Sequence, residues 1–286
     1  MATQSKSGED HWDSSAYQSA ASFVPKLATK VIGWLDVQKD DVILDIGCGD
    51  GVLNLQIAGT LSKGTGKIHG VDSSASMIDT AQKDAAAAGV DGICTFEVLD
   101  ATKLSTKSDL ASGRYDKVFS NAALHWILRP EENRDDFFKG VYAVLKRDGI
   151  FCFEMGGFGN VAEMHTVFLS VLTRRLGITA ARAADPWFFP DETWMSRALA
   201  SHSFEVVKIE REYRPTKVDA SGVAGWVELM GKQFFDKVEE VMGKQEREQA
   251  EREAIEVLGT VCGGEGVGEG GDWIGYVRLR GVARKI

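Results

Sequence analysis

Apolar positions along the chain predict short strands that alternate with helices. Continuous apolar runs such as 42–46 are typical of strands buried on both faces of a sheet. Apolar residues repeated at steps of three and four indicate amphipathic helices. We expect strands at 42–46, 67–71, 93–99, 115–120, 149–154, 204–213 and 273–283. We expect helices at 19–35, 52–61, 74–88, 131–145, 161–176, 192–201 and 234–258.

This alternation determines the predicted fold class. Strands that alternate with helices of about 10–15 residues imply βαβ units and a parallel sheet covered on both faces. After Met155 the alternation of strands and helices gives way to helices joined by the aromatic and proline-rich segment 186–190. Such a segment suits a cover over the edge of the sheet where ligands bind. The sequence therefore predicts an α/β fold, a doubly wound, mostly parallel seven-stranded sheet with a helical cover inserted after strand five.

Composition and charge narrow the class of protein. The chain is 44% apolar and 26% charged, which excludes wholesale disorder. No apolar run approaches the ~18 residues of a membrane span, and residues 1–13 contain no apolar signal segment. A net charge of −9 argues against nucleic acid as a partner, because such binding depends largely on Lys and Arg. The four cysteines form no CxxC pair, so we expect reduced thiols, no metal site and a cytoplasmic protein.

A glycine-rich turn, Asp-Ile-Gly-Cys-Gly-Asp-Gly at 45–51, lies between the first predicted strand and the next helix. Glycine lets the backbone turn sharply and approach a ligand closely, and the helix that follows directs unpaired N–H groups toward an anion. Such a turn alone is a weak signal, since many tight turns contain two or three glycines. Its position between a strand and a helix makes it a candidate ligand site.

Acidic residues strengthen this interpretation. Asp45, Asp72 and Asp100 lie at the ends of three successive predicted strands, at the sheet edge where open α/β folds bind ligands. Asp72 follows Gly51 by about twenty residues, the spacing from which an acid contacts ribose hydroxyls. Asp72 and Asp100 each also suit a simpler role as caps of the turns that follow them. NAD is the nearest alternative ligand, but Leu53 stands where a third glycine is usual.

These motifs together resemble the class I S-adenosylmethionine-dependent methyltransferases. The segments that carry the resemblance are 42–51, 70–77, 99–101, 115–126 and 145–154. More narrowly, residues 121–126, 154–160 and 12–17 are similar to the branch that contains trans-aconitate methyltransferase. The resemblance implies a Rossmann-like methyltransferase fold, S-adenosyl-L-methionine as the cofactor and S-adenosyl-L-homocysteine as its product.

The resemblance also implies roles at the methionyl end of this cofactor. Asp45 and the Gly47 backbone hold the ammonium group. Gly49 and Gly51 make room for the cofactor, and Asn121 faces the methionyl moiety.

At the nucleoside end the resemblance implies a second set of contacts. Asp72 accepts hydrogen bonds from both ribose hydroxyls, while Ser73 and Met77 pack beside the adenine. Asp100 accepts from the adenine amino group, with the Ala101 backbone beside it.

Three residues are the catalytic candidates. The resemblance places Trp12 and Tyr17 over the sulfonium. Alignment supplies most of the catalysis in methyl transfer, but a hydroxyl or amine acceptor also needs a base. His125 is the best candidate for that base, because histidine titrates near neutral pH. The alternative is a hydrogen-bonded structural histidine beside Trp126.

The expected acceptor is a small, mostly apolar molecule with one oxygen, sulfur or nitrogen nucleophile. We expect the rim of the acceptor pocket to be aromatic, formed by Trp12, Tyr17, Trp126, Trp187, Phe188 and Phe189. The arginines that can bind a carboxylate there are Arg129, Arg174, Arg175 and Arg182. Adjacent helical residues point about 100° apart, so Arg174 and Arg175 cannot both face one pocket. A trans-aconitate-type carboxylate O-methyltransferase and an inactive cofactor-binding partner subunit are the alternatives.

The predicted organisation has four parts. Residues 1–36 form an N-terminal cover segment and helix, and 37–155 the cofactor-binding core. Residues 156–202 form a helical cover over the acceptor site, and 203–286 supply the C-terminal strands and helix that complete the sheet.

Overall fold

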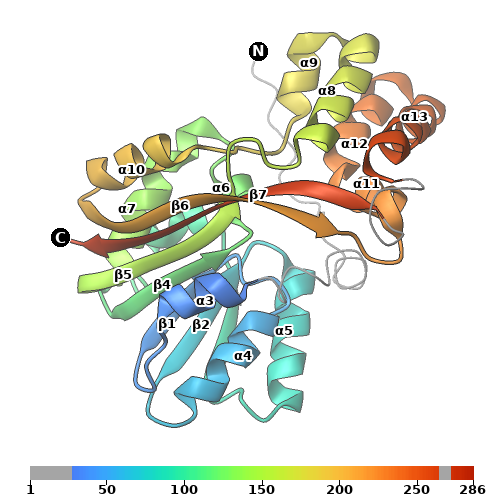
Figure 1. The fold of residues 1–286 in the computed structure, drawn as a ribbon. Coiled ribbons are helices and arrows are strands. Elements are labelled where there is room, and N and C mark those ends of the chain that lie inside the picture. Colours follow the sequence, from blue (N-terminus) through green and yellow to red (C-terminus); the bar gives the residue numbers. More distant parts are fainter. Residues whose placement is uncertain (1–27, 264–271) are drawn as a thin grey trace.

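Seven strands form one sheet in the order β3-β2-β1-β4-β5-β7-β6 in the computed structural model, which describes residues 28–263 and 272–286 (Figure 1). The strands are β1 (Val42–Ile46), β2 (Lys67–Asp72), β3 (Cys94–Val98), β4 (Tyr115–Asn121), β5 (Leu145–Gly156), β6 (Phe204–Lys217) and β7 (Trp273–Lys285). From β3 to β5 neighbouring strands run parallel, whereas β7 is antiparallel to both β5 and β6. The predicted α/β fold with a mostly parallel seven-stranded sheet is confirmed.

Helices cover both faces of this sheet (Figure 1). On one face lie α3 (Thr29–Leu35), α4 (Val52–Leu61) and α5 (Ala75–Ala87); on the other lie α7 (Arg134–Val144) and α10 (Glu192–Ser201), with the 3-10 helix η1 (Ala101–Thr106) against α7. Successive residues of β5 alternate between the two cores: Phe151 and Phe153 join the core of α7 and α10, whereas Cys152 joins that of α3, α4 and α5. Burial on both faces explains why the strands are continuous apolar runs.

A third apolar core lies at one end of the sheet, where five helices gather (Figure 1). They are α8 (Ala162–Leu176), α9 (Ile178–Ala184), α11 (Gly222–Met230), α12 (Lys232–Met242) and α13 (Lys244–Cys262). Their side chains pack around Trp187 and around Ile274 and Tyr276 of β7. Helices from both sides of β6 in the sequence therefore share one core.

The predicted helix over 234–258 is wrong in one respect. Gly243, with φ 91° and ψ 169°, leaves the helical conformation and divides the segment into α12 and α13. The short helix α6 (Leu124–Ile127) and the helices α9 and α11 were not predicted. In the described ranges no helix is both long and apolar enough to cross a membrane.

Candidate active site

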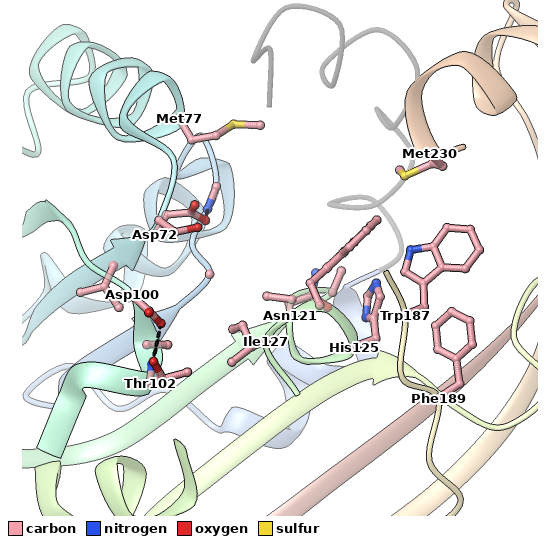
Figure 2. Close-up of a pocket in the computed structure, with 18 of the residues that line it drawn as sticks. Asp72, Met77, Asp100, Thr102, Asn121, His125, Ile127, Trp187, Phe189 and Met230 are labelled. Atoms are coloured by element: carbon pink, nitrogen blue, oxygen red, sulfur yellow. Dashed lines mark hydrogen bonds between the residues drawn. The ribbon is translucent and has the colours of Figure 1, made fainter. Parts of the chain in front are cut away.

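A cavity of about 460 Å³ opens where β1, β2 and β4 reach their carboxyl ends. Figure 2 shows two groups of side chains that face each other across it. Asp72, Met77, Asp100 and Thr102 lie at one end, His125, Trp187, Phe189 and Met230 at the other, with Asn121 and Ile127 between them. The predicted residues Gly47, Gly49, Ser73 and Ala101 also line it.

The glycines of the turn after β1 have different roles. A Cβ atom on Gly47 would lie 2.2 Å from Ala123 Cβ, so glycine permits the close approach of the β1 and β4 turns. A Cβ on Gly49 would meet nothing within 4 Å, which leaves this position open. Gly51 lies outside the cavity: its Cβ would meet Ala81 at 2.9 Å and Phe96 at 3.0 Å. Glycine at position 51 thus permits close packing of this turn against α5 and β3, while its expected role in making room for the cofactor stays a prediction.

Asp72 is fixed by the backbone at the acidic end of the cavity. Its Oδ2 accepts a hydrogen bond from the Gly49 N–H at 3.0 Å, and its Oδ1 accepts from the Ser74 N–H at 2.9 Å. Ser74, rather than Asp72, caps α5 through the Met77 N–H. The carboxylate therefore ties the turn after β1 to the turn after β2 and holds a set orientation toward the cavity.

Asp100 combines the two roles considered for it. Its Oδ1 accepts from the Thr102 N–H at 2.9 Å and from the Thr102 hydroxyl at 2.8 Å, so it caps η1 (Figure 2). It also lines the cavity. One oxygen of the carboxylate thus serves the turn, while Oδ2 makes no hydrogen bond among the described residues.

Asp45, by contrast, is 2% exposed and is not among the residues that line the cavity. Burial, together with the negative charge of Asp72, raises its pKa to about 8. The carboxyl group is therefore largely protonated in the unliganded protein at neutral pH.

This raised pKa predicts a pH dependence of stability. Folding favours the protonated form, so the contribution of Asp45 is fully present below its unfolded pKa of about 3.9 and is lost as the pH rises through about 8. The limiting slope is about 1.4 kcal/mol per pH unit. We expect the unfolding free energy of the wild type to fall from pH ~5 to pH ~8 relative to that of Asp45→Asn. Denaturant titrations at several pH values measure this difference, and parallel pH profiles would contradict it.

His125 is 8% exposed and lies between aromatic rings, with ring centres 5.5 Å from Trp126 and 5.7 Å from Phe189. Burial, and then the positive charge of Arg278, lower its pKa well below the ordinary range. The Gly156 N–H donates to Nδ1 at 3.4 Å, so the neutral ring carries its proton on Nε2. This geometry favours a hydrogen-bond donor over a general base.

The aromatic rim is partly where we expected it. Trp126, Trp187 and Phe189 line the cavity. Phe188 does not: it packs under the Arg134 guanidinium, 3.8 Å from the ring centre, and against Trp194. Trp12 and Tyr17, predicted as catalytic residues, lie outside the described residues.

None of the four predicted arginines lines the cavity. The Arg129 guanidinium donates to the carbonyl oxygens of Asp185 and Arg182, at 2.6 and 2.9 Å. Arg174 and Arg175 both pair with Glu253. The arginine that does line the cavity is Arg278 on β7.

Sequence reasoning missed a group of cavity residues from distant parts of the chain. They are Asn160, Trp226, Met230, Tyr276 and Arg278. The period-2 alternation of strand 273–283 places Tyr276, Arg278 and Arg280 on one face. That alternation was the available signal for the β7 residues, whereas α11 was not predicted at all.

Arg278 belongs to a buried ionic network around Glu154 of β5. Glu154 Oε1 accepts from Arg278 Nε at 2.9 Å and lies 3.6 Å from Arg214 Nη2, while Oε2 accepts from Arg280 Nε. Burial alone would raise the pKa of Glu154, but the charges of the three arginines lower it overall. Among the described residues, no three His, Cys, Asp or Glu side chains are placed to hold a metal ion.

Known proteins are similar to this chain in sequence and in fold. A family model described as a methyltransferase domain matches residues 37–166. An uncharacterized methyltransferase, C70.08c of Schizosaccharomyces pombe, is 37% identical over 229 residues, which cover 79% of this chain and 83% of the relative. The chain belongs to the methyltransferase family. The predicted enzyme class is thereby confirmed.

Two further methyltransferases show the limits of this likeness. Trans-aconitate 2-methyltransferase of Pseudomonas paraeruginosa is 32% identical over 75 residues, only 26% of either chain. The structure of geranyl diphosphate C-methyltransferase from Streptomyces coelicolor, in complex with Mg²⁺, geranyl diphosphate and S-adenosyl-L-homocysteine, has a TM-score of 0.51 at 14% identity. The superposition covers 91% of this methyltransferase and 79% of the Streptomyces chain, so the two proteins share a fold.

Proposed function

We propose that this methyltransferase transfers a methyl group from S-adenosylmethionine to a small molecule. The observation that carries the proposal is the two-ended cavity: fixed carboxylates lie at one end and aromatic side chains at the other (Figure 2). The first end has the polarity of a nucleoside site, and the second suits a mostly apolar acceptor.

The residues at the acidic end fit this cofactor. Asp72 is oriented to accept from ribose hydroxyls, Met77 offers an apolar surface for the adenine, and Asp100 keeps Oδ2 for the adenine amino group. Asn121 Oδ1 is buried and has no hydrogen-bond partner among the described residues. Because a buried acceptor without a partner is costly, Asn121 suits the methionyl ammonium group. The S-adenosylhomocysteine bound by the structural neighbour supports the same cofactor.

When bound, S-adenosylmethionine supplies a methyl group already activated by its sulfonium. The remaining task of the chain is to align the acceptor and exclude water, which Trp126, Trp187 and Phe189 are placed to do. At the acceptor end the pKa of His125 is lowered, and burial raises that of Tyr276 to about 12. Neither residue is a base poised for neutral pH. This favours a nucleophile that ionises on its own, a carboxylate or thiolate.

A tricarboxylate acceptor of the trans-aconitate kind is a second candidate. The 32% identity over 75 residues favours it. The arginines that would bind a second and third carboxylate, Arg129 and Arg182, lie outside the cavity, where Arg129 holds backbone carbonyls. The cavity therefore supports an acceptor with a single anionic group better.

Thermal melts test the cofactor part of the proposal. S-adenosylmethionine and S-adenosylhomocysteine should each stabilise the fold by ~2.7 kcal/mol at a hundredfold excess over the dissociation constant. NAD should not stabilise the fold, because Leu53 stands where a dinucleotide-binding turn usually has its third glycine. A rise in Tm with NAD and none with S-adenosylhomocysteine would overturn the proposal.

A further inference from the structure

Arg278 lies at the acceptor end of the cavity, and only the Nε of its guanidinium group is bound by another of the described residues. Its side chain is 5% exposed, and its Nε donates to Glu154 Oε1 at 2.9 Å. No oxygen of the described residues accepts a hydrogen bond from Nη1 or Nη2. Since Arg278 lines the cavity, these two nitrogens are the part of the side chain left for a ligand.

Two more donors surround the same end. Asn160 is 4% exposed, and its Oδ1 accepts from the Val277 N–H at 2.9 Å, so the remaining Nδ2 amide group is a donor. His125 presents the Nε2–H, because Nδ1 accepts from Gly156. The two carboxylates that line the described cavity, Asp72 and Asp100, both lie at the opposite end (Figure 2). The acceptor end thus offers donors to an anion.

Of the arginines around Glu154, Arg278 is the one that lines the cavity. Arg280 also pairs with Glu210 and Glu212 on its far side, which neutralises it away from the cavity. Arg278 and Arg214 both contact the carboxylate of Glu154. The cationic guanidinium of Arg278 at the cavity wall, with no carboxylate of the described lining beside it, matches the carboxylate of a ligand.

The position of Arg278 separates this site from the cofactor end. Arg278 pairs with Gly156 of β5, and β5 lies between β7 and β4 in the sheet. The acids that suit the nucleoside follow β2 and β3, on the other side of β1 and β4. Trp187 and Phe189 stand with His125 at the other end of the cavity (Figure 2). Arg278 belongs to that end, because its charge acts on His125.

We propose that Arg278, held by Glu154 and assisted by Asn160, binds the carboxylate of the methyl acceptor, so that the acceptor is an acid with an aromatic or otherwise apolar body. This inference rests on the proposed function, because it assigns the second end of the cavity to the acceptor. Guanidinium and amide donors fix the acid group, and the aromatic side chains take the apolar body.

Matched pairs of ligands test the anchor directly. The probes are 3-phenylpropionate and indole-3-acetate, each against its primary amide, titrated by calorimetry with and without S-adenosylhomocysteine. We expect each acid to bind the wild type about 10- to 100-fold more tightly than its amide. In Arg278→Gln this preference should disappear, while the affinity for S-adenosylhomocysteine changes by less than about twofold. Arg278→Lys should restore part of it through the charge alone.

Arg284→Gln is the control on the same strand, because Arg284 is 46% exposed and pairs with Glu205 outside the cavity. It should retain the full preference for the acids. Acids that bind the wild type no better than their amides, or not at all, would overturn the anchor. A loss of affinity for S-adenosylhomocysteine of tenfold or more in Arg278→Gln would instead assign Arg278 to the cofactor carboxylate. Failure of the wild type to bind S-adenosylhomocysteine would reject the proposed function separately, since the pairs are also compared without it.

Discussion

Replacement of Asp72 by alanine is expected to weaken the binding of S-adenosylhomocysteine by about 10- to 1,000-fold. In the proposed binding mode the carboxylate accepts from two ribose hydroxyls, and its orientation is set by the Gly49 and Ser74 N–H groups. The substitution also removes the hydrogen bonds through which Asp72 links the turn after β1 to the turn after β2. Calorimetric titration measures the affinity, and circular dichroism shows whether the fold survives.

Asp79→Ala is the matched control for this experiment. Asp79 lies on the same helix as Met77 but is exposed and does not line the cavity. Its removal should leave the affinity within about twofold of the wild type. If Asp72→Ala binds as tightly as Asp79→Ala, Asp72 serves only the turn after β2.

Glu154→Gln is expected to lower the free energy of unfolding by about 3–5 kcal/mol, because it leaves the buried Arg278 without its counter-charge. Glu154 is 2% exposed and contacts Arg278, Arg280 and Arg214. Its pKa lies below the ordinary value, so the stabilisation is present at neutral pH and is lost as the pH falls through that lowered pKa. Chemical denaturation at neutral pH measures the effect.

Glu205→Gln provides the comparison at the surface. Glu205 is 50% exposed and pairs with Arg284 on the same pair of strands, so its removal should cost less than about 1 kcal/mol. An equal loss of unfolding free energy in the two variants would show that Glu154 does not stabilise the fold by neutralising a buried charge.

The core of the fold was predictable because its signals are local. Strand β1, helix α4 and helix α10 have the predicted bounds, since an apolar run or a helical period is contained within each of them. The break at Gly243 was not predictable in the same way, because the helical period continues on both sides of it. A single glycine with positive φ decides that α12 and α13 are separate helices.

The site residues also divide into those that local signals predict and those that only the tertiary structure reveals. Asp72 and Asp100 were found because strand ends meet at one edge of a parallel sheet, a rule that needs only the order of elements. Arg278 was missed because it reaches the cavity through the insertion of β7 between β5 and β6, more than a hundred residues after Glu154. Arg129 was misassigned because its partners are backbone carbonyls of residues 182 and 185, which only the tertiary structure brings together.

The most direct test of the account is transfer of label from [methyl-³H]S-adenosylmethionine to a panel of aromatic and aliphatic acids, thiols and phenols. The account predicts that S-adenosylhomocysteine and a labelled small molecule form in equal amounts, only when an acceptor is present, and that Asp72→Ala loses this activity at limiting cofactor. Tight binding of S-adenosylmethionine without transfer to any member of the panel would contradict the account and indicate a cofactor-binding partner subunit instead.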